Sequence, residues 1–360
     1  MSGNGAFKAY CGPSGGWGSV RSLGNILSRE GVLASGSLAL TRQNKVDGFQ
    51  CVSCAWSKPA HTLPFEFCEN GAKATAWEIA AHRCPPGFFA KHTVTELLTW
   101  KDYDLERTGR LTHPLRHDPA SDKYLAVQWQ DAFAEIGGEL RAIEDKKSVV
   151  FYSSGRCSNE ASYLYGLFAR LYGNNNLPDS SNMCHETTSV ALPESIGVPV
   201  GTVTLDDFAK TDCIMFFGQN PGSNSPRMLH ALQHASERGV PIIAYNPLRE
   251  RGLERFINPQ SASQMPSGQS TRIASQYHQV KAAGDLAALT GICKALVEMD
   301  RASAATAVLD HAFIAEHTEG FDRFRDWLDT QTWDELERRA GLARATMEAT
   351  VAFTAPAWSC

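Results

Sequence analysis

A thiol and an imidazole stand next to each other at Cys184 and His185, within the polar run 182–190. The run leads into a segment with the character of a helix. A thiol at a helix N-terminus with a basic neighbour is expected to supply thiolate, which is both a nucleophile and a ligand for soft metals. A cysteine hydrolase is the weaker interpretation, because thiol–imidazole pairs usually assemble from distant segments. Cys184 is therefore predicted to ligate a metal.

A second group of cysteines begins at Cys51-Val52-Ser53-Cys54. A CxxC pair places two thiolates on one turn, the spacing that zinc or an iron–sulfur cluster needs. Cys68 and Cys84 follow, so a four-cysteine site is one interpretation, and a reduced pair without metal is the other. A thioredoxin-type pair is disfavoured, because no strand pattern leads into the motif and no helix pattern leaves it. Lys73 lies near Cys68, which makes this otherwise ordinary lysine a candidate site residue.

The elements that must position these groups follow a strand–helix rhythm after a turn-like stretch at 109–115. The predicted strands are 148–153, 212–217 and 240–245, and the predicted helices are 159–172 and 227–238. Gly239 follows the second helix at C′, where a positive φ is cheap for glycine. Alternating apolar strands and amphipathic helices predict an α/β fold with a doubly wound parallel sheet.

Ligands in such a sheet bind beyond the carboxyl ends of the strands. Three loops leave those ends, at 154–156, 218–226 and 246–252. No GxGxxG or GxxxxGK[ST] motif is present, which disfavours ordinary dinucleotide and P-loop sites. The glycines, asparagines and prolines could simply make tight turns, but two successive polar loops favour a ligand site. Its predicted residues are Gly218, Asn220, Gly222 and Ser223 in one loop, and Asn246, Arg249 and Arg251 in the next.

The bulk composition excludes several classes of protein. A net charge of −5 and the lack of basic runs interleaved with aromatic residues argue against nucleic-acid binding. No apolar stretch reaches the length of a membrane span. The glycine-rich start, Met1 to Trp17, has no apolar signal core, so a cytoplasmic location is predicted. The ten cysteines are then expected to be reduced, and to bind metal or be buried.

Four runs of residues resemble the molybdopterin oxidoreductase superfamily, in particular the formate dehydrogenase-like alpha subunits. In chain order they are Phe67-Cys68-Glu69-Asn70-Gly71-Ala72-Lys73, Asn182-Met183-Cys184-His185-Glu186, Phe217-Gly218-Gln219-Asn220-Pro221-Gly222 and Asn246-Pro247-Leu248-Arg249-Glu250-Arg251-Gly252-Leu253-Glu254-Arg255-Phe256. The order of the runs is more specific than any one of them. The resemblance extends from about Gly15 to about Met347.

The resemblance implies a molybdenum bis(molybdopterin guanine dinucleotide) cofactor and a [4Fe-4S] cluster. Cys184 matches the residue that ligates molybdenum in this family, and His185 the neighbouring histidine that handles protons. Cys51, Cys54 and Cys68 match cluster ligands, and Lys73 lies near a lysine that passes electrons between cluster and pterin. The loops 218–226 and 246–252 match segments that hold the guanine dinucleotide. Formate becomes a candidate substrate, and electron-transfer subunits become candidate partners.

Two departures from the family pattern matter. Position 58 is Lys58 where a cluster cysteine is usual, so the cluster is expected to be absent, three-ligated or completed by a group such as Cys84. The chain is also shorter than family members, so the C-terminal part of the family fold is expected to be missing. The predicted division is a cysteine-rich region with the iron–sulfur site at 1–108 and the α/β region at 109–360. The leading prediction is a molybdenum-dependent oxidoreductase, and the alternative is a non-catalytic fragment with a partial nucleotide site.

Overall fold

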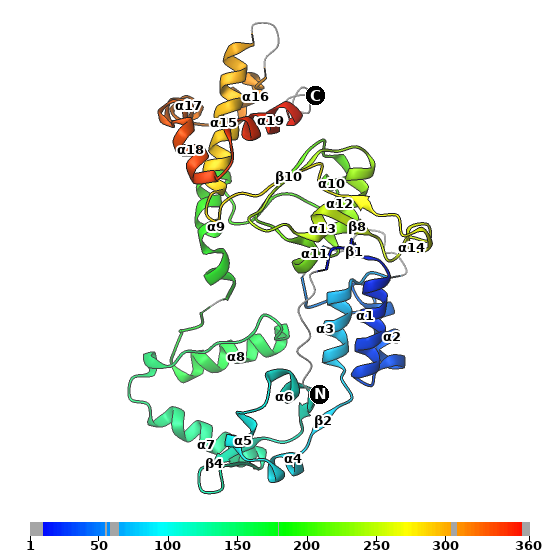
Figure 1. Ribbon diagram of the computed structural model, residues 1–360. Helices are drawn as coiled ribbons and strands as arrows, with labels where there is room; N and C mark the ends of the chain where they lie inside the picture. Colours follow the sequence, from blue (N-terminus) through cyan, green and yellow to red (C-terminus); the bar gives the residue numbers. More distant parts are fainter. Residues whose placement is uncertain (1–9, 55, 58–64, 179, 304–307, 355–360) are drawn as a thin grey trace. The chain divides into compact units, whose positions relative to one another are not determined.

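The computed structural model describes residues 10–54, 56–57, 65–178, 180–303 and 308–354 (Figure 1). The chain forms two compact units that interleave along the sequence. Unit 1 contains residues 1–26, 38–75 and 204–360, and unit 2 contains residues 27–37 and 76–203. The chain therefore passes between the units within helices α1 (Gly16–Arg29), α2 (Leu33–Arg42) and α3 (Glu69–Glu78). The predicted division at residue 108 stays a prediction.

The centre of unit 1 is a three-stranded parallel sheet in the order β10-β7-β6. Its strands are β6 (Ile214–Phe217), β7 (Ile242–Tyr245) and β10 (Gln276–His278). The two registers pair Ile214 with Ile242 and Gln276 with Ile243. All three strands run in the same direction, so their carboxyl ends meet at one edge of the sheet.

Helices cover both faces of this sheet because its side chains alternate between two apolar cores. One face, with Phe216, Ile242 and Ala244, packs against α12 (Met228–Glu237). The other face, with Ile243 and Tyr245, packs against α15 (Asp285–Ala302) and two later helices. Strands buried on both faces are typical of parallel sheets in α/β proteins.

The remaining elements of unit 1 surround the sheet (Figure 1). A second sheet joins β1 (Ser14–Gly15) in parallel to β8 (Arg255–Ile257), and β8 antiparallel to β9 (Thr271–Arg272). The shorter helices are α10 (Asp207–Lys210), α11 (Pro221–Asn224), α13 (Arg251–Glu254) and α14 (Gln264–Ser267). The C-terminal helices are α16 (His311–His317), α17 (Phe321–Thr330), α18 (Trp333–Ala340) and α19 (Arg344–Thr354). Helices α18 and α19 pack on α15 and complete the second core.

Unit 2 consists of helices and short strands. The strands pair as β2 (Arg83–Cys84) with β3 (Arg110–Leu111) in parallel, and β4 (Leu115–Asp118) with β5 (Lys123–Ala126) antiparallel. The helices are α4 (Pro86–Lys91), α5 (Val94–Leu97), α6 (Asp102–Arg107), α7 (Trp129–Ala142), a 3₁₀ turn (Lys146–Ser148), α8 (Asn159–Tyr172) and α9 (Ser180–Ile196). No described helix of either unit has the length and hydropathy needed to cross a membrane.

The predicted α/β class with a parallel sheet is confirmed, and most predicted elements lie where expected. Helix α8 has the predicted bounds, and Gly239 follows α12 with a φ of 83°. The predicted strand at 148–153 is wrong. Side chains occupy a backbone acceptor there: Asn174 Nδ2 donates to Val149 O (2.7 Å), and Asn176 Nδ2 donates to the same oxygen (3.2 Å). Val150 and Tyr152 remain exposed, so the apolar run does not enter a sheet.

Replacing Leu232 tests the core between α12 and the sheet. Leu232 is completely buried, so Leu232→Ala is expected to lower the free energy of unfolding by about 2–5 kcal/mol. Leu286, which is 74% exposed on α15, provides the control, and Leu286→Ala should change stability by less than about 0.5 kcal/mol. Urea unfolding followed by circular dichroism measures both. Equal effects of the two substitutions would contradict the described core.

Candidate functional site

The two predicted strand-end loops lie side by side at the carboxyl edge of the parallel sheet. The buried Asn246, directly after β7, joins them through its amide. Its Nδ2 donates to Asn220 Oδ1 (2.8 Å) and to Gln219 O (3.2 Å), and its Oδ1 accepts from Leu248 N (2.9 Å). One side chain thus holds the two loops together.

Two glycines allow the loops to approach each other closely. A Cβ on Gly222 would lie 2.1 Å from Glu250 Oε1 and 3.0 Å from Gly252 Cα. A Cβ on Gly252 would lie 2.7 Å from Gly222 Cα. Any side chain at either position would push the loops apart. Glu250 also caps α13, because its Oε2 accepts from Leu253 N (2.9 Å). The glycines are therefore needed for the contact itself and not only for turns.

Arg249 and Arg251 do not extend freely from the second loop. Both pair with Glu254, at 2.7 Å from Arg249 Nη2 to Oε1 and 2.7 Å from Arg251 Nη1 to Oε2. Together with Arg255 and Arg272 they line a cavity of about 680 Å³. Glu254 holds the two guanidinium groups near each other and offsets part of their positive charge. Their role in ligand binding stays a prediction.

Asp285, at the start of α15, carries a buried polar atom that no sequence pattern predicted. It begins α15, which follows β10. Its Oδ1 is buried and has no hydrogen-bond partner in the part of the chain that the structure describes. A buried acceptor without a donor is rare in native proteins and requires an explanation, such as a bound water, ion or ligand. The strand before this helix could not be predicted, because β10 is only three residues long and its sequence, Gln-Tyr-His, is not strongly apolar.

The thiols of Cys51 and Cys68 approach each other around Gly71. A Cβ on Gly71 would lie 2.9 Å from Cys51 Sγ and 3.7 Å from Cys68 Sγ. Backbone N–H groups donate to both sulfurs, from Ser53 to Cys51 and from Gly71 to Cys68, each at 3.4 Å. We call Cys51, Cys54, Cys68, Gly71 and Gln43 the thiol pocket. Gln43 is fully buried there, and no sequence pattern predicted its place in this pocket.

Burial, opposed by the Gly71 backbone N–H and reinforced by the nearby Cys54 and Cys51 sulfurs, raises the pKa of Cys68 to about 11. Without a metal, Cys68 is therefore a neutral thiol at pH 7. Metal binding would have to release its proton, so the affinity should rise with pH. The backbone N–H donors, in contrast, are suited to sulfur that carries negative charge.

The thiol pocket is not in ligand geometry as it stands. Among the described residues, no three Cys, His, Asp or Glu side chains are placed to hold a metal ion together. Cys84, the fourth cysteine considered, belongs to unit 2 and is enclosed by apolar residues that include Phe89 and Leu97. That environment does not favour ligation by Cys84. Lys58 lies outside the described residues.

Two contacts connect residues that flank the thiol pocket to the α/β part of unit 1. Asn70 Nδ2 donates to Ser223 O in the first strand-end loop (2.7 Å). Arg227, at the start of α12, pairs with the buried Glu66 (2.9 Å) and donates to Trp56 O (3.1 Å). Both Trp56 and Glu66 belong to the cysteine-containing segment. The pocket is therefore fixed relative to the loops.

Asn44 extends the second connection to Cys51. It is buried and has a φ of 58°, a left-handed conformation that asparagine tolerates. Its Nδ2 donates to Glu66 O (2.6 Å), and its Oδ1 accepts from Cys51 N (2.9 Å). The backbone of Cys51 is thus positioned by the same segment that Arg227 holds.

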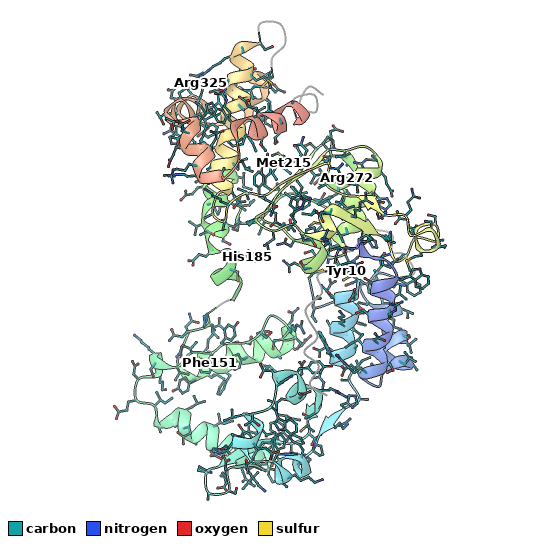
Figure 2. The ribbon with its side chains drawn as sticks, viewed as in Figure 1. Tyr10, Phe151, His185, Met215, Arg272 and Arg325 are labelled. Atoms are coloured by element: carbon teal, nitrogen blue, oxygen red, sulfur yellow. The ribbon has the colours of Figure 1, made fainter. Side chains whose placement is uncertain are left out.

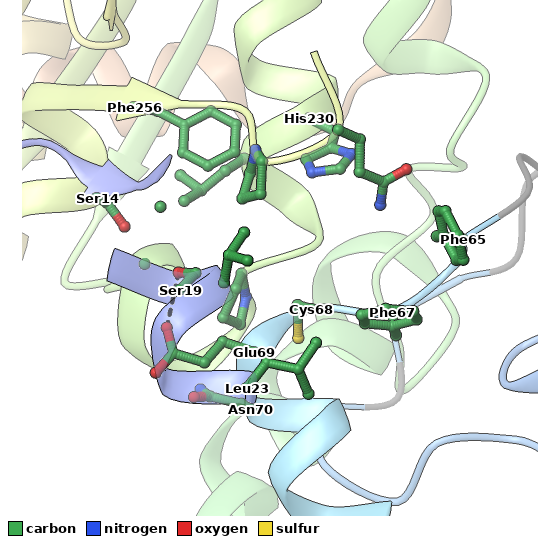
Figure 3. Close-up of a pocket in the computed structure, with 17 residues that line it drawn as sticks. Ser14, Ser19, Leu23, Phe65, Phe67, Cys68, Glu69, Asn70, His230 and Phe256 are labelled. Atoms are coloured by element: carbon green, nitrogen blue, oxygen red, sulfur yellow. Dashed lines mark hydrogen bonds between the residues drawn. The ribbon is translucent and has the colours of Figure 1, made fainter. Parts of the chain in front are cut away.

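A cavity of about 210 Å³ reaches from the thiol pocket to the first strand-end loop (Figure 3). Its walls are mainly apolar, with Leu23, Phe67 and Phe256 among them. Cys68 lines one part and Gly222 another. The polar lining residues include Ser19, Glu69, Asn70 and His230, which Figure 3 labels. Apolar walls with a few polar groups are typical of ligand pockets.

Burial and hydrogen bonding decide which side chains around this cavity are charged. Burial opposes ionisation of Glu69, but hydrogen bonds from Lys73 and Ser19 outweigh it and lower the pKa of Glu69. Lys73 Nζ lies 2.7 Å from Glu69 Oε1, so the predicted site lysine is held near the start of α3. Burial and the nearby Arg227 charge lower the pKa of His230 to about 4, so His230 is neutral at pH 7.

Cys184 and His185 lie in unit 2, on α9, where Figure 2 labels His185. Both side chains are exposed. The helix begins at Ser180, so Cys184 lies in its second turn and not at its N-terminus as the sequence analysis assumed. The influence of the helix N-terminus declines within the first turn. The Cys184 sulfur is not enclosed in an apolar core, and its role as a metal ligand stays a prediction.

Comparison with known proteins defines the class. The Molybdopterin oxidoreductase family model matches residues 110–309, more than half of the chain. The chain therefore belongs to the molybdopterin oxidoreductase family.

Individual relatives agree with this assignment. The chain is 48% identical over 340 residues to Protein YdeP of Escherichia coli (strain K12), covering 94% of this chain and 45% of YdeP. It is 26% identical over 240 residues to the F420-dependent formate dehydrogenase 1 subunit alpha of Methanococcus maripaludis, covering 66% of this chain and 32% of that one. Acetylene hydratase from Pelobacter acetylenicus has a similar fold, with a TM-score of 0.50 and 18% identity over 66% of this chain and 30% of that one. The chain thus spans less than half the length of these proteins.

The Arg227–Glu66 pair can be tested by removing one charge and then both. Arg227→Met should lower the free energy of unfolding by about 3–5 kcal/mol, because it leaves the buried Glu66 carboxylate without its arginine. The double variant Arg227→Met/Glu66→Met should recover much of this loss. The exposed Arg301–Asp329 pair is the control, and Arg301→Met should have little effect. Urea unfolding of wild type, Arg227→Met, Glu66→Met and the double variant measures the coupling, and additive effects of the two single substitutions would contradict the pairing.

Proposed function

We propose that this chain is the part of a molybdenum-dependent, formate dehydrogenase-like oxidoreductase that binds the pterin dinucleotide cofactor and an iron–sulfur centre. The observation that carries the proposal is the Asn70–Ser223 hydrogen bond, because it joins the thiol pocket to the strand-end loops. A redox centre and a nucleotide-type site in direct contact suit a protein that moves electrons to or from a bound cofactor.

Bound molybdopterin guanine dinucleotide would supply two-electron redox chemistry at molybdenum. The strand-end loops would bind its nucleotide part: Gly222 permits close backbone approach, and Asn220 and Asn246 present amides. Gly218 and Ser223 lie in the same loop. The buried Oδ1 of Asp285 would accept from a donor such as the amino or imide N–H of guanine. Arg249 and Arg251 would exchange Glu254 for phosphate oxygens.

The thiol pocket would hold the iron–sulfur centre through Cys51, Cys54 and Cys68. Three thiolates bind fewer than the four iron atoms of a [4Fe-4S] cluster, so a further ligand would complete it. Lys73, held by Glu69 near Cys68, would lie on the electron route between the centre and the pterin. Cys184 would bind molybdenum through its exposed sulfur, and His185 would accept or return a proton.

The content of bound metal and nucleotide tests the cofactor sites. We expect anaerobically purified protein, produced in cells that make the cofactor, to contain molybdenum, guanine nucleotide and iron. Gly222→Ala should lower molybdenum and guanine at least tenfold, because its Cβ would lie 3.0 Å from the backbone Cα of Gly252 in the neighbouring loop and 2.1 Å from Glu250 Oε1. Gly18→Ala is the matched control, since its Cβ would meet open space. Cys51→Ser should lower iron and leave molybdenum unchanged.

Two results would count against the proposal. Metal-free wild-type protein would support the alternative, a non-catalytic protein that keeps the fold. Unchanged molybdenum in Gly222→Ala would remove the strand-end loops from the site.

The role of Cys184 requires a protein that extends over the full length of the family fold. There Cys184→Ser should leave bound pterin unchanged and lower turnover of formate by at least a hundredfold, because a hydroxyl is a harder and much less acidic ligand. Cys157→Ser, in the same unit, controls for loss of a thiol. Formate oxidation with an artificial electron acceptor measures turnover. Equal turnover by Cys184→Ser and wild type would contradict the ligand assignment, and no turnover by wild type would exclude formate as the substrate.

A further inference from the structure

Gln43 has a buried amide that the protein itself does not satisfy. The side chain is 0% exposed, and its Nε2 has no hydrogen-bond partner in the part of the chain that the structure describes. The other end of the amide is fixed, because Oε1 accepts from Thr75 Oγ1 at 3.2 Å. A native protein rarely buries an amide donor without an acceptor, so this group requires an explanation.

The unsatisfied nitrogen lies beside the same glycine as two cysteine sulfurs. The position that a Cβ would take on Gly71 lies 2.7 Å from Gln43 Nε2, 2.9 Å from Cys51 Sγ and 3.7 Å from Cys68 Sγ. The amide and both sulfurs therefore surround the same glycine. Two backbone N–H groups already point at these sulfurs, as described above. Gln43 adds a side-chain donor to this set.

A set of N–H donors is suited to negative sulfur and not to neutral thiols. A neutral thiol is only a weak hydrogen-bond acceptor. Thiolate and inorganic sulfide are stronger acceptors because they carry charge. The donors of the pocket thus match a metal centre ligated by these cysteines.

We propose that Gln43 donates a hydrogen bond to a sulfur of the iron–sulfur centre and raises its reduction potential. This rests on the proposed function, which places that centre on Cys51, Cys54 and Cys68. Reduction adds one electron to the centre and moves no proton on Gln43. The added negative charge strengthens the N–H···S bond, so the donor stabilises the reduced form more than the oxidised form. Gln43 would therefore tune the reduction potential of the centre through this single hydrogen bond.

The test is a redox titration of the anaerobically purified chain with dithionite, followed by electron paramagnetic resonance. Gln43→Met removes both amide hydrogens at similar volume. We expect it to retain iron and to make reduction about tenfold less favourable, a fall in midpoint potential of about 59 mV for one electron. Gln233→Met is the matched control. Gln233 is also buried and donates to Thr271 (2.8 Å), but it belongs to α12 and not to the thiol pocket.

The outcomes separate this inference from the proposed function. Iron-free wild-type protein overturns both. Bound iron with an unchanged midpoint in Gln43→Met overturns the role of Gln43 and leaves the proposed iron–sulfur centre intact. A fall in midpoint of similar size in Gln233→Met also overturns it, because any lost buried amide would then suffice.

If Gln43→Met does not fold or loses iron, two further variants test whether Gln43 donates to the iron–sulfur centre. Thr75→Val keeps Gln43 but removes the hydroxyl that orients its amide, so a smaller fall in midpoint is expected. Gln43→Glu keeps the shape but replaces the donor by a negative charge, so a larger fall or loss of iron is expected. An unchanged midpoint in both variants would show that Gln43 does not donate to the centre.

Discussion

The buried ion pair between Arg227 and Glu66 is the contact on which the candidate site depends. Arg227 belongs to the α/β part of unit 1, whereas Glu66 belongs to the cysteine-containing segment. From Glu66 the connection continues through Asn44 to the backbone of Cys51. A buried ion pair adds little net stability compared with apolar side chains, but it tolerates few alternative arrangements. Its effect here is to fix the position of a segment that has little apolar core of its own.

At the carboxyl edge of the sheet, too, a few contacts fix one segment against another. Here they are close backbone contacts and not an ion pair. Gly222 and Gly252 bring two loops to a separation that no side chain permits, and Asn246 satisfies groups on both. The polar edge therefore depends on residues that are invisible to hydrophobic patterning. Among the described residues, Asp285 has an unsatisfied buried acceptor at the start of α15, and Gln43 has an unsatisfied buried donor in the thiol pocket.

Elements with a clear apolar periodicity could be predicted from the sequence. The prediction was wrong where side chains, and not a neighbouring strand, bind the backbone. Apolar spacing predicts the helices α8 and α12 and the strands β6 and β7. The rule that ligands bind at strand ends then predicts that the loops after these strands form the candidate site. The segment 148–153 has the same apolar character, but Asn174 and Asn176 both donate to the Val149 carbonyl, and no local pattern reveals partners so far along the chain. Gln43, Asn44 and Asp285 were missed for a related reason. Their importance lies in being buried and oriented, which only the tertiary structure determines.

Under the proposed function, the two halves of the site should strengthen each other's binding. The thiol pocket must lose a proton from Cys68 and bring its sulfurs closer before it can hold a metal, so part of the binding free energy is used to order its cysteine side chains. A cofactor that immobilises the loop at Ser223 also immobilises Asn70 through their hydrogen bond, and hence the start of α3 beside Cys68. Part of the ordering is then complete before the metal binds. Linkage is reciprocal, so a bound metal centre must favour cofactor binding by the same factor. The close connection between the pocket and the loops therefore has a thermodynamic consequence as well as a geometric one: each centre selects the protein conformation that the other needs.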